Sequence, residues 1–210
     1  GDQTFKFIGT DDHIPVRFID FDDLGNNRLV VSEEVTFGPE GNARRFDVVL
    51  WVNGIPLVVI ETKTPVNASV SWLNAARDIS NVYEPQKPSF FAPNVFSVAT
   101  EGRELHYGAV GQSPESWLMW GSTSDPLDMD PFTRLSRSVD LLLNPNSVLS
   151  VLKNFTLFER TPSGTTRKLI PRYPQYEAAE AIVNRVLDGG KQGLIWHYQG
   201  TGKSLLMAFA

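Results

Sequence analysis

The fold is decided by residues 45–63, which read RFDVVLWVNGIPLVVIETK. Within this stretch, two nearly continuous apolar runs, residues 48–52 and 55–60, flank Asn53-Gly54, a dipeptide typical of a β-hairpin turn. Strands that are apolar at almost every position are expected to be buried on both faces of a sheet. The stretch therefore predicts a buried hairpin at the centre of an α/β domain.

The elements on either side of this hairpin are predicted from local patterns. Residues 20–27 are acidic and turn-rich, which predicts a loop, and the β-branched, apolar residues 29–37 predict a strand. After Pro65, apolar residues from Trp72 to Tyr83 recur at close to helical spacing, so we expect a helix that ends before Pro85. Further along we expect strands at 95–100 and 105–110 joined by a turn at 101–102, a strand at 116–120, an exposed acidic loop at 121–131, helices at 132–143 and 147–155, an amphipathic helix at 176–187 and a short strand at 194–196.

Three charged residues, Asp47, Glu61 and Lys63, lie near the ends of the apolar hairpin strands. Side chains alternate between the two faces of a strand, so Glu61 and Lys63 point the same way. A buried charge is costly unless it is paired or binds a metal, and carboxylates from two neighbouring strands can hold Mg²⁺, which prefers oxygen ligands. Lys63 could orient or deprotonate an attacking water and offset charge on a phosphate. The three residues therefore predict metal-dependent hydrolysis of a phosphodiester.

The length of the hairpin turn decides whether the two carboxylates share a face. A two-residue turn at Asn53-Gly54 would place Asp47 opposite Ile60 and direct it away from Glu61. A three-residue loop over residues 52–54, with Gly54 in the left-handed bulge position, would place Asp47 opposite Val59. Asp47 and Glu61 would then be diagonal neighbours on one face, with backbones roughly 7–8 Å apart. We predict the three-residue loop.

The spacing of these residues also fits a simpler interpretation. A Glu–Lys pair on the surface of an edge strand would show the same pattern, and Asp…Glu-x-Lys is short enough to recur by chance. The sequence around Asp47, Glu61 and Lys63 indicates a family more specifically than these three residues do. Residues 45–63, and above all NGIPLVVIETK at 53–63, closely resemble the nuclease core of the restriction (motor) subunits of type I restriction–modification enzymes.

This resemblance implies a PD-(D/E)XK nuclease-like mixed sheet flanked by helices. It also implies that Asp47 and Glu61 bind a divalent metal, Mg²⁺, and that Lys63 is catalytic. Its implied partners are double-stranded DNA and the methyltransferase (modification) and specificity subunits of the same restriction system, and in the family another subunit reads the target sequence.

The chain departs from the family's pattern on the helix after the hairpin. Such subunits usually carry a Gln and a Tyr one helical turn apart, whereas this chain has Asp78 where the glutamine might fall, and Tyr83 follows five residues later. Tyr83 is a candidate DNA contact, although half-buried packing on the helix also explains it. The family often has a further acidic residue on an upstream helix, and we assign none.

A second motif, HYQGTGKS at residues 197–204, is a P-loop. Backbone N–H groups of Gly200, Thr201 and Gly202 are expected to face phosphate oxygens, Lys203 to reach the outer phosphates and Ser204 to coordinate Mg²⁺. The strict pattern has Gly where this chain has His197, a departure usual in superfamily 2 helicases and translocases, which the segment resembles. The resemblance implies the start of a RecA-like motor domain that binds ATP.

Upstream of the P-loop, Gln175 stands at the beginning of the predicted amphipathic helix. In the motors that the segment resembles, a glutamine at this place reads the adenine edge, because an amide both donates and accepts hydrogen bonds. Gln175 is therefore a candidate for base recognition. A polar residue at a helix N-terminus explains it equally simply.

The two motifs occur in an order that indicates the domain organisation. We expect an endonuclease domain at residues 1–160, a linker at 161–170, for which TPSGTT at 161–166 is the best candidate stretch, and the truncated start of a motor at 171–210. The chain ends six residues after Ser204 and carries neither the acidic motif for ATP hydrolysis nor a second motor lobe. We therefore expect the fragment alone to show no DNA-stimulated ATPase activity.

Composition excludes several other classes of protein. The 210 residues contain no cysteine, which rules out a disulfide framework, a thiolate metal site and a cysteine nucleophile. No apolar run is long enough to span a membrane and no signal peptide opens the chain, so we expect a cytoplasmic protein with no membrane partner. The net charge of −5 is uneven, because residues 1–40 carry −6, residues 41–150 carry −3 and residues 151–210 carry +4.

Three functions remain open at this point. The first is the Mg²⁺-dependent endonuclease domain of an ATP-dependent type I restriction enzyme. The second is a non-cleaving scaffold that senses duplex DNA or docks the motor, and the third is a repair-type nuclease–helicase. Metal binding at Asp47 and Glu61 would separate the first function from the second, and co-purification with a methyltransferase and a specificity subunit would exclude the third.

Overall fold

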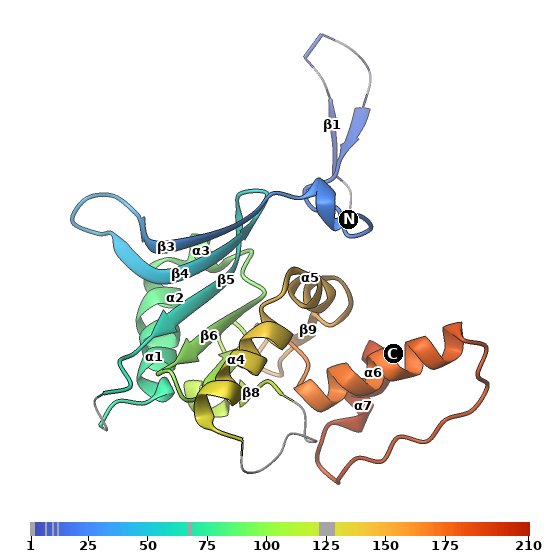
Figure 1. The fold of residues 1–210 in the computed structure, drawn as a ribbon. Helices are drawn as coiled ribbons and strands as arrows, with labels where there is room; N and C mark the ends of the chain where they lie inside the picture. Colours follow the sequence, from blue (N-terminus) through green and yellow to red (C-terminus); the bar gives the residue numbers. More distant parts are fainter. Residues whose placement is uncertain (1–2, 7, 10, 12, 67–68, 122–128) are drawn as a thin grey trace.

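The structure, a computed structural model, describes residues 3–210 apart from 7, 10, 12, 67–68 and 122–128, so most of the acidic loop predicted at 121–131 lies outside the described residues. Its centre is a six-stranded mixed sheet in the order β3-β4-β5-β6-β7-β8 (Figure 1). The strands are β3 (Leu29–Phe37), β4 (Arg44–Val52), β5 (Ile55–Thr62), β6 (Phe96–Thr100), β7 (Leu105–Gly108) and β8 (Leu118–Met119). Only the β5–β6 pair is parallel among the described strands.

Helices cover both faces of this sheet, as the prediction of an α/β domain requires. One face packs Val49, Val59 and Ala99 against Ala75 and Ile79 of the crossover between β5 and β6. The other face packs against α4 (Pro131–Leu142) and α5 (Pro145–Asn154), whose apolar residues join those of α6 (Tyr173–Leu187) and α7 (Lys203–Phe209) in one core. The central strands β5 and β6 are thus buried on both faces, which explains their continuous apolar sequence.

The β4–β5 hairpin is present, but its turn differs from the prediction. Val52 pairs directly with Ile55, so the turn has two residues, Asn53 and Gly54, which both have positive φ angles, of 52° and 81°. The three-residue loop is therefore wrong. A β-bulge lies one pair further along the hairpin, where Leu50 pairs with Val58 and Leu57 is left unpaired. The bulge shifts the register by one residue, as the predicted three-residue loop would also have done.

This bulge changes the position of Asp47. Beyond it Val48 pairs with Ile60, which is the last pair of the β4–β5 ladder, so Asp47 does not pair with Val59 as predicted. Asp47 lies just past the end of this ladder, where its carboxylate reaches Thr62, the residue after Glu61. The two-residue turn alone would have directed Asp47 away from Glu61.

The crossover from β5 to β6 is more continuous than predicted. It consists of α1 (Trp72–Asp78), one turn of π-helix (Ile79–Tyr83), α2 (Glu84–Gln86) and α3 (Pro88–Phe91). In the π-helical turn the N–H group of Glu84 donates to the carbonyl of Ile79, five residues back. The prediction that the helix ends before Pro85 is therefore wrong, since helical backbone continues through the proline.

The residues of the expected linker lie in a hairpin, in which β9 (Leu157–Arg160) pairs with β10 (Thr166–Leu169) around a turn at residues 161–165, and the division into domains stays a prediction. Two other predictions are corrected by the structure. The predicted strand at residues 194–196 is not formed, and the side chains of Leu194 and Trp196 are exposed. The helix predicted to begin at residue 176 begins at Tyr173.

The N-terminal segment forms a further hairpin that the sequence patterns did not indicate. β1 (Gln3–Lys6) pairs with β2 (His13–Val16), and this hairpin projects from the body of the molecule at the top of Figure 1. Among the described residues, no helix has the length and apolar composition that crossing a membrane would require. The remaining predicted strands and helices are present within a few residues of their expected bounds.

Candidate active site

Glu61 is the most enclosed charged side chain of the predicted site, with 4% of its side chain exposed. It lies near the end of β5 and points to the face that packs against the crossover helices, because its neighbours in register, such as Ala99 of β6, belong to that core. Its Oε1 atom accepts hydrogen bonds from Lys63 Nζ at 2.7 Å and from the Tyr83 hydroxyl at 3.2 Å. β5 thus places the Glu61 carboxylate in the largely apolar layer between the sheet and the crossover helices.

The environment of Glu61 leaves part of its carboxylate unsatisfied. Its Oε2 atom is buried and accepts no hydrogen bond. Burial raises the pKa of Glu61, and the nearby charge of Asp47 raises this pKa further, against the hydrogen bonds from Lys63 and Tyr83. A carboxylate in this state is destabilised in its charged form unless a cation approaches the free oxygen.

Asp47 is held at the end of the β4–β5 ladder. Its Oδ2 atom accepts hydrogen bonds from the backbone N–H of Thr62 at 2.9 Å and from the Thr62 hydroxyl at 2.8 Å. These bonds fix the carboxylate beside the residue that follows Glu61. Sequence reasoning did not single out Thr62, because its role depends on the strand register that the bulge creates.

Lys63 joins the two strands of the site to the crossover helix. Its Nζ atom lies 2.7 Å from Glu61 Oε1 and 2.7 Å from Asp78 Oδ2. Burial lowers the pKa of Lys63, but hydrogen bonds to Asp78 and Glu61, together with their charges, outweigh it and raise the pKa above its ordinary value. The amine is therefore a fixed cation between two carboxylates.

Asp78 and Tyr83 both reach this site because of the π-helical turn between them. A residue five positions along lies one turn away in a π-helix, where hydrogen bonds run over five residues, so the spacing that departed from the family's pattern still brings both side chains to one place. Burial raises the pKa of Tyr83 to about 12, so its hydroxyl donates to Glu61. The role of Tyr83 as a DNA contact stays a prediction.

The predicted metal site has carboxylate donors that suit a divalent cation. Asp47 and Glu61 supply carboxylate oxygens from neighbouring strands, and the free Oε2 of Glu61 is an acceptor without a partner. Magnesium is often held by one or two carboxylates together with water and substrate phosphates, so the donors present fit the ion. In the part of the chain that the structure describes, no group of three or more His, Cys, Asp and Glu side chains is placed to hold a metal.

The P-loop residues have a different setting. Gly202, at φ +78°, precedes α7, and the side-chain amide of Gln175 donates to the carbonyls of Thr201, at 2.9 Å, and Gly202, at 3.2 Å. The Oε1 atom of Gln175 accepts from the backbone N–H of Arg172. Gln175 is thus buried against the loop and ties it to the start of α6; whether it also reads adenine stays a prediction.

The phosphate-binding groups of that loop make local contacts. Lys203 Nζ donates to the carbonyl of Tyr198 at 2.8 Å, and the Thr201 hydroxyl donates to the same carbonyl at 2.9 Å. Lys203, Ser204 and Tyr198 are exposed. Their roles in binding phosphates and Mg²⁺ stay predictions.

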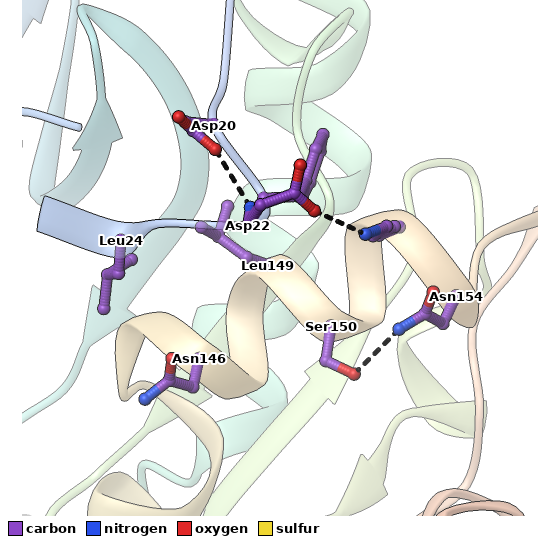
Figure 2. Close-up of a pocket in the computed structure, with 9 residues that line it drawn as sticks. Asp20, Asp22, Leu24, Asn146, Leu149, Ser150 and Asn154 are labelled. Carbon is purple, nitrogen blue, oxygen red and sulfur yellow. Dashed lines mark hydrogen bonds and ion pairs between the residues drawn. The ribbon is translucent and has the colours of Figure 1, made fainter. Parts of the chain in front are cut away.

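A small cavity lies away from both motifs, between the loop after β2 and α5 (Figure 2). Its volume is about 200 Å³, and Asp20, Asp22 and Lys153 are among its lining residues. Hydrogen bonds from Asn26 and from the backbone of the loop lower the pKa of Asp20 to about 2. Asp22 forms an ion pair with Lys153 at 3.6 Å. The cavity is therefore a place where the N-terminal segment is attached to α5.

Comparison with known proteins gives matches to both parts of the chain. The family described as "type I restriction enzyme R protein N terminus" matches residues 2–116, and the family described as "SWI2/SNF2 ATPase" matches residues 174–210. The type I restriction enzyme HindI endonuclease subunit of Haemophilus influenzae is 30% identical over 206 residues, which cover 92% of this chain and 19% of that protein.

Relatives from other organisms carry similar names. The putative type I restriction enzyme MjaVIIIP endonuclease subunit of Methanocaldococcus jannaschii is 28% identical over 203 residues, covering 90% of this chain and 18% of that protein. The SauCOLORF180P endonuclease subunit of Staphylococcus aureus is 22% identical over 195 residues, covering 91% of this chain and 20% of that protein. The chain spans about a fifth of the length of these curated relatives.

Proposed function

The chain belongs to the family of type I restriction enzyme R protein N termini, and from this premise we propose that its sheet domain is the DNA-cutting part of such a subunit. The observation that carries the proposal is the buried Glu61 carboxylate, whose Oε2 atom is unpartnered beside Lys63. Glu84 and Glu101 also have a buried carboxylate oxygen without a partner, so it is the combination with Lys63 and the nearby charge of Asp47 that supports a cation ligand at Glu61. We assign the domain to the PD-(D/E)XK nucleases on this arrangement and on the motif at residues 45–63.

The residues of the site divide the work of phosphodiester hydrolysis between them. Asp47 and Glu61 would hold a divalent cation, which would supply Lewis-acid polarisation of the scissile phosphate and of a bound water. Lys63 carries its positive charge at the same place, where it can orient the water and offset the negative charge that develops on the phosphate. Thr62 and Tyr83 fix the two carboxylates through hydrogen bonds.

We propose that the C-terminal part of the chain begins an ATP-driven translocase. The support is the match of residues 174–210 to SWI2/SNF2 ATPases and the P-loop at Gly200–Ser204, with Gln175 packed against it. In the whole protein, ATP with Mg²⁺ would bind at Lys203 and Ser204. The enzyme would translocate duplex DNA, together with the methyltransferase and specificity subunits of the same system.

The test uses the intact subunit assembled with its partner subunits and a duplex carrying the recognition site. Asp47→Ala and Lys63→Ala are expected to lower the rate of DNA cutting at least about 100-fold, because each removes a group that acts on the reacting phosphate. ATP hydrolysis should remain close to that of the parent enzyme. Cutting is measured on plasmid DNA, and ATP hydrolysis by phosphate release.

Lys203→Ala is the matched control, because it should abolish ATP hydrolysis and leave the fold of the sheet domain unchanged. If both Asp47→Ala and Lys63→Ala still cut at the parent rate, the nuclease assignment fails. The domain would then act as a non-cleaving scaffold for the motor.

A further inference from the structure

Lys63 has two carboxylate partners, and one of them belongs to neither strand of the nuclease motif. Its Nζ atom lies at the same distance, 2.7 Å, from Glu61 Oε1 and from Asp78 Oδ2. We infer that Asp78 is a positioning residue, which holds Lys63 at the reacting phosphate and so keeps Glu61 free to bind the metal. The inference rests on the proposed nuclease function and adds a residue to it.

The backbone explains how Asp78 comes to hold this lysine. Asp78 ends α1, directly before the π-helical turn, and that helix lies over the face of the sheet to which Glu61 and Lys63 point. The Lys63 side chain is 24% exposed and that of Asp78 is 43% exposed, so the pair lies at the rim of the site and not in bulk solvent. Lys63 is thus supported from the helix side as well as from its own strand.

The need for this support follows from the chemistry of Glu61. If Glu61 were the sole counter-ion of the Lys63 ammonium group, its negative charge would be only partly available to a bound metal ion. A second carboxylate on Lys63 removes that competition, because the lysine stays paired when Glu61 turns to a cation. Asp47, Glu61 and Asp78 together carry two formal negative charges more than Lys63 neutralises, which matches a divalent cation.

The neighbouring residue on the same helix shows what a purely structural pair looks like. Arg77 pairs with Glu115 at 2.9 Å, and both side chains are about half exposed. This pair contacts neither Glu61 nor Lys63 in the described structure. Glu115 lies in the turn Pro114–Ser116, so removing it takes away a carboxylate that pairs with α1 without touching the site, which makes it a matched control.

The first measurement is metal binding, which does not depend on turnover. Mn²⁺ is titrated calorimetrically into the intact subunit without nucleotide or DNA. Asp78→Asn and Asp78→Ala are expected to weaken binding about 10-fold, the lower end of the range for residues that orient metal ligands. Asp78→Glu, which keeps the charge on a longer side chain, should recover part of the loss, and Glu115→Ala should bind Mn²⁺ as the parent does.

A double-mutant cycle separates an action through Lys63 from a direct one. In the Lys63→Ala background, Asp78→Ala should cause no further loss of Mn²⁺ affinity beyond about 2-fold, because the residue that Asp78 positions is gone. An undiminished loss in that background would overturn the positioning role and show that Asp78 acts on the metal itself. Equal Mn²⁺ affinity of parent, Asp78→Asn and Asp78→Ala would also overturn it.

DNA cutting gives the second measurement and distinguishes the two proposals. Asp78→Asn should cut about 10- to 100-fold more slowly with ATP hydrolysis unchanged. If the parent cuts and binds Mn²⁺ and the Asp78 variants equal it, only the positioning role fails. If the parent binds no Mn²⁺ and Lys63→Ala cuts normally, the nuclease assignment fails and the role of Asp78 with it. Thermal unfolding of each variant verifies that the fold is retained.

Discussion

The two regions that carry the chemistry of this chain are held in place by different means. At the end of β5, Glu61 is enclosed by a sheet and a helix, and its partners come from residues 2 to 22 positions away along the chain. At the P-loop, Lys203 is exposed and its side-chain partner is the carbonyl of Tyr198, five residues before it. The first site is a product of tertiary packing and the second of a local turn.

This difference determines how each region should respond to change. A site assembled from β4, β5 and the crossover helix depends on the core beneath it, so a mutation far from the carboxylates can displace them. The P-loop turn depends on its own backbone angles, on the hydrogen bonds from Gln175 and on the packing of α7 after it. Three substitutions, or pairs of substitutions, test this contrast.

The largest effect is expected from the core under the first site. Phe46 is fully buried and contacts the rings of Tyr83, Phe90 and Phe91. Phe46→Ala should lower the free energy of unfolding by about 3–5 kcal/mol, because it leaves a cavity in a packed aromatic cluster. Chemical denaturation followed by tryptophan fluorescence measures the change.

Trp196 supplies the counterpart near the second site, because its side chain is 84% exposed. Trp196→Ala should change the free energy of unfolding by no more than about 0.5 kcal/mol. Comparable losses from the two substitutions would contradict the contrast between a packed and a local site.

A smaller effect, dependent on pH, is expected from Glu84, which follows the π-helical turn. It is buried, its Oε2 accepts from the N–H of Gly111 at 2.8 Å and its Oε1 has no partner. Burial raises the pKa of Glu84 to about 7 from an ordinary value of 4.5. The folded protein then holds a proton that the unfolded chain has lost, so stability falls as the pH rises from about 4.5 to about 7, by at most about 3 kcal/mol.

Glu84→Gln should remove this pH dependence, because an amide keeps an acceptor for Gly111 without titrating. The variant should equal the parent near pH 4.5 and exceed it in melting temperature at pH 8. Melting curves across this range provide the measurement, and a parent whose stability rises over pH 5–7 in the same way as the variant would contradict the assignment.

Effects on stability smaller than those expected at Phe46 and Glu84 come from two glycines with positive φ angles. Gly54 in the hairpin turn has φ +81° with open space around its α-carbon, so Gly54→Ala should cost about 1–2 kcal/mol from backbone strain alone. Gly202 has φ +78°, and a β-carbon there would collide with the amide of Gln175. Gly202→Ala should therefore also break the anchor of the P-loop, which ATP binding to the intact subunit would report as a loss of affinity.

The order of strands and helices could be predicted where the signal is local. A hairpin at Asn53-Gly54, the apolar strands around it and a helix that ends at Leu187, before Gly189, all follow from patterns of a few residues. The structure confirms these elements, although not the predicted length of the turn. Local patterns fail at residues 194–196, where the apolar residues predict a strand. In the described structure these residues pair with no other strand.

The geometry of the site is harder to predict from the sequence than the order of elements, because it depends on irregularities of single residues. The hairpin turn was predicted to be too long, since nothing in the sequence marks Leu57 as the unpaired residue of a bulge. Asp78 was noted as a departure from a family pattern and not as a partner of Lys63, because a regular α-helix would have separated it from Tyr83. Pro85 was taken as a helix end, although the helical backbone runs through it.

The π-helical turn also has a consequence for the comparison of sequences. One residue inserted into a regular α-helix rotates everything after it by about 100° relative to what came before. Here the wide turn over Ile79–Tyr83 takes up one residue more than an α-helical turn, and helical backbone continues from it into α2. Against a relative whose helix is regular at this place, we therefore expect the alignment to need a one-residue gap between positions 78 and 83.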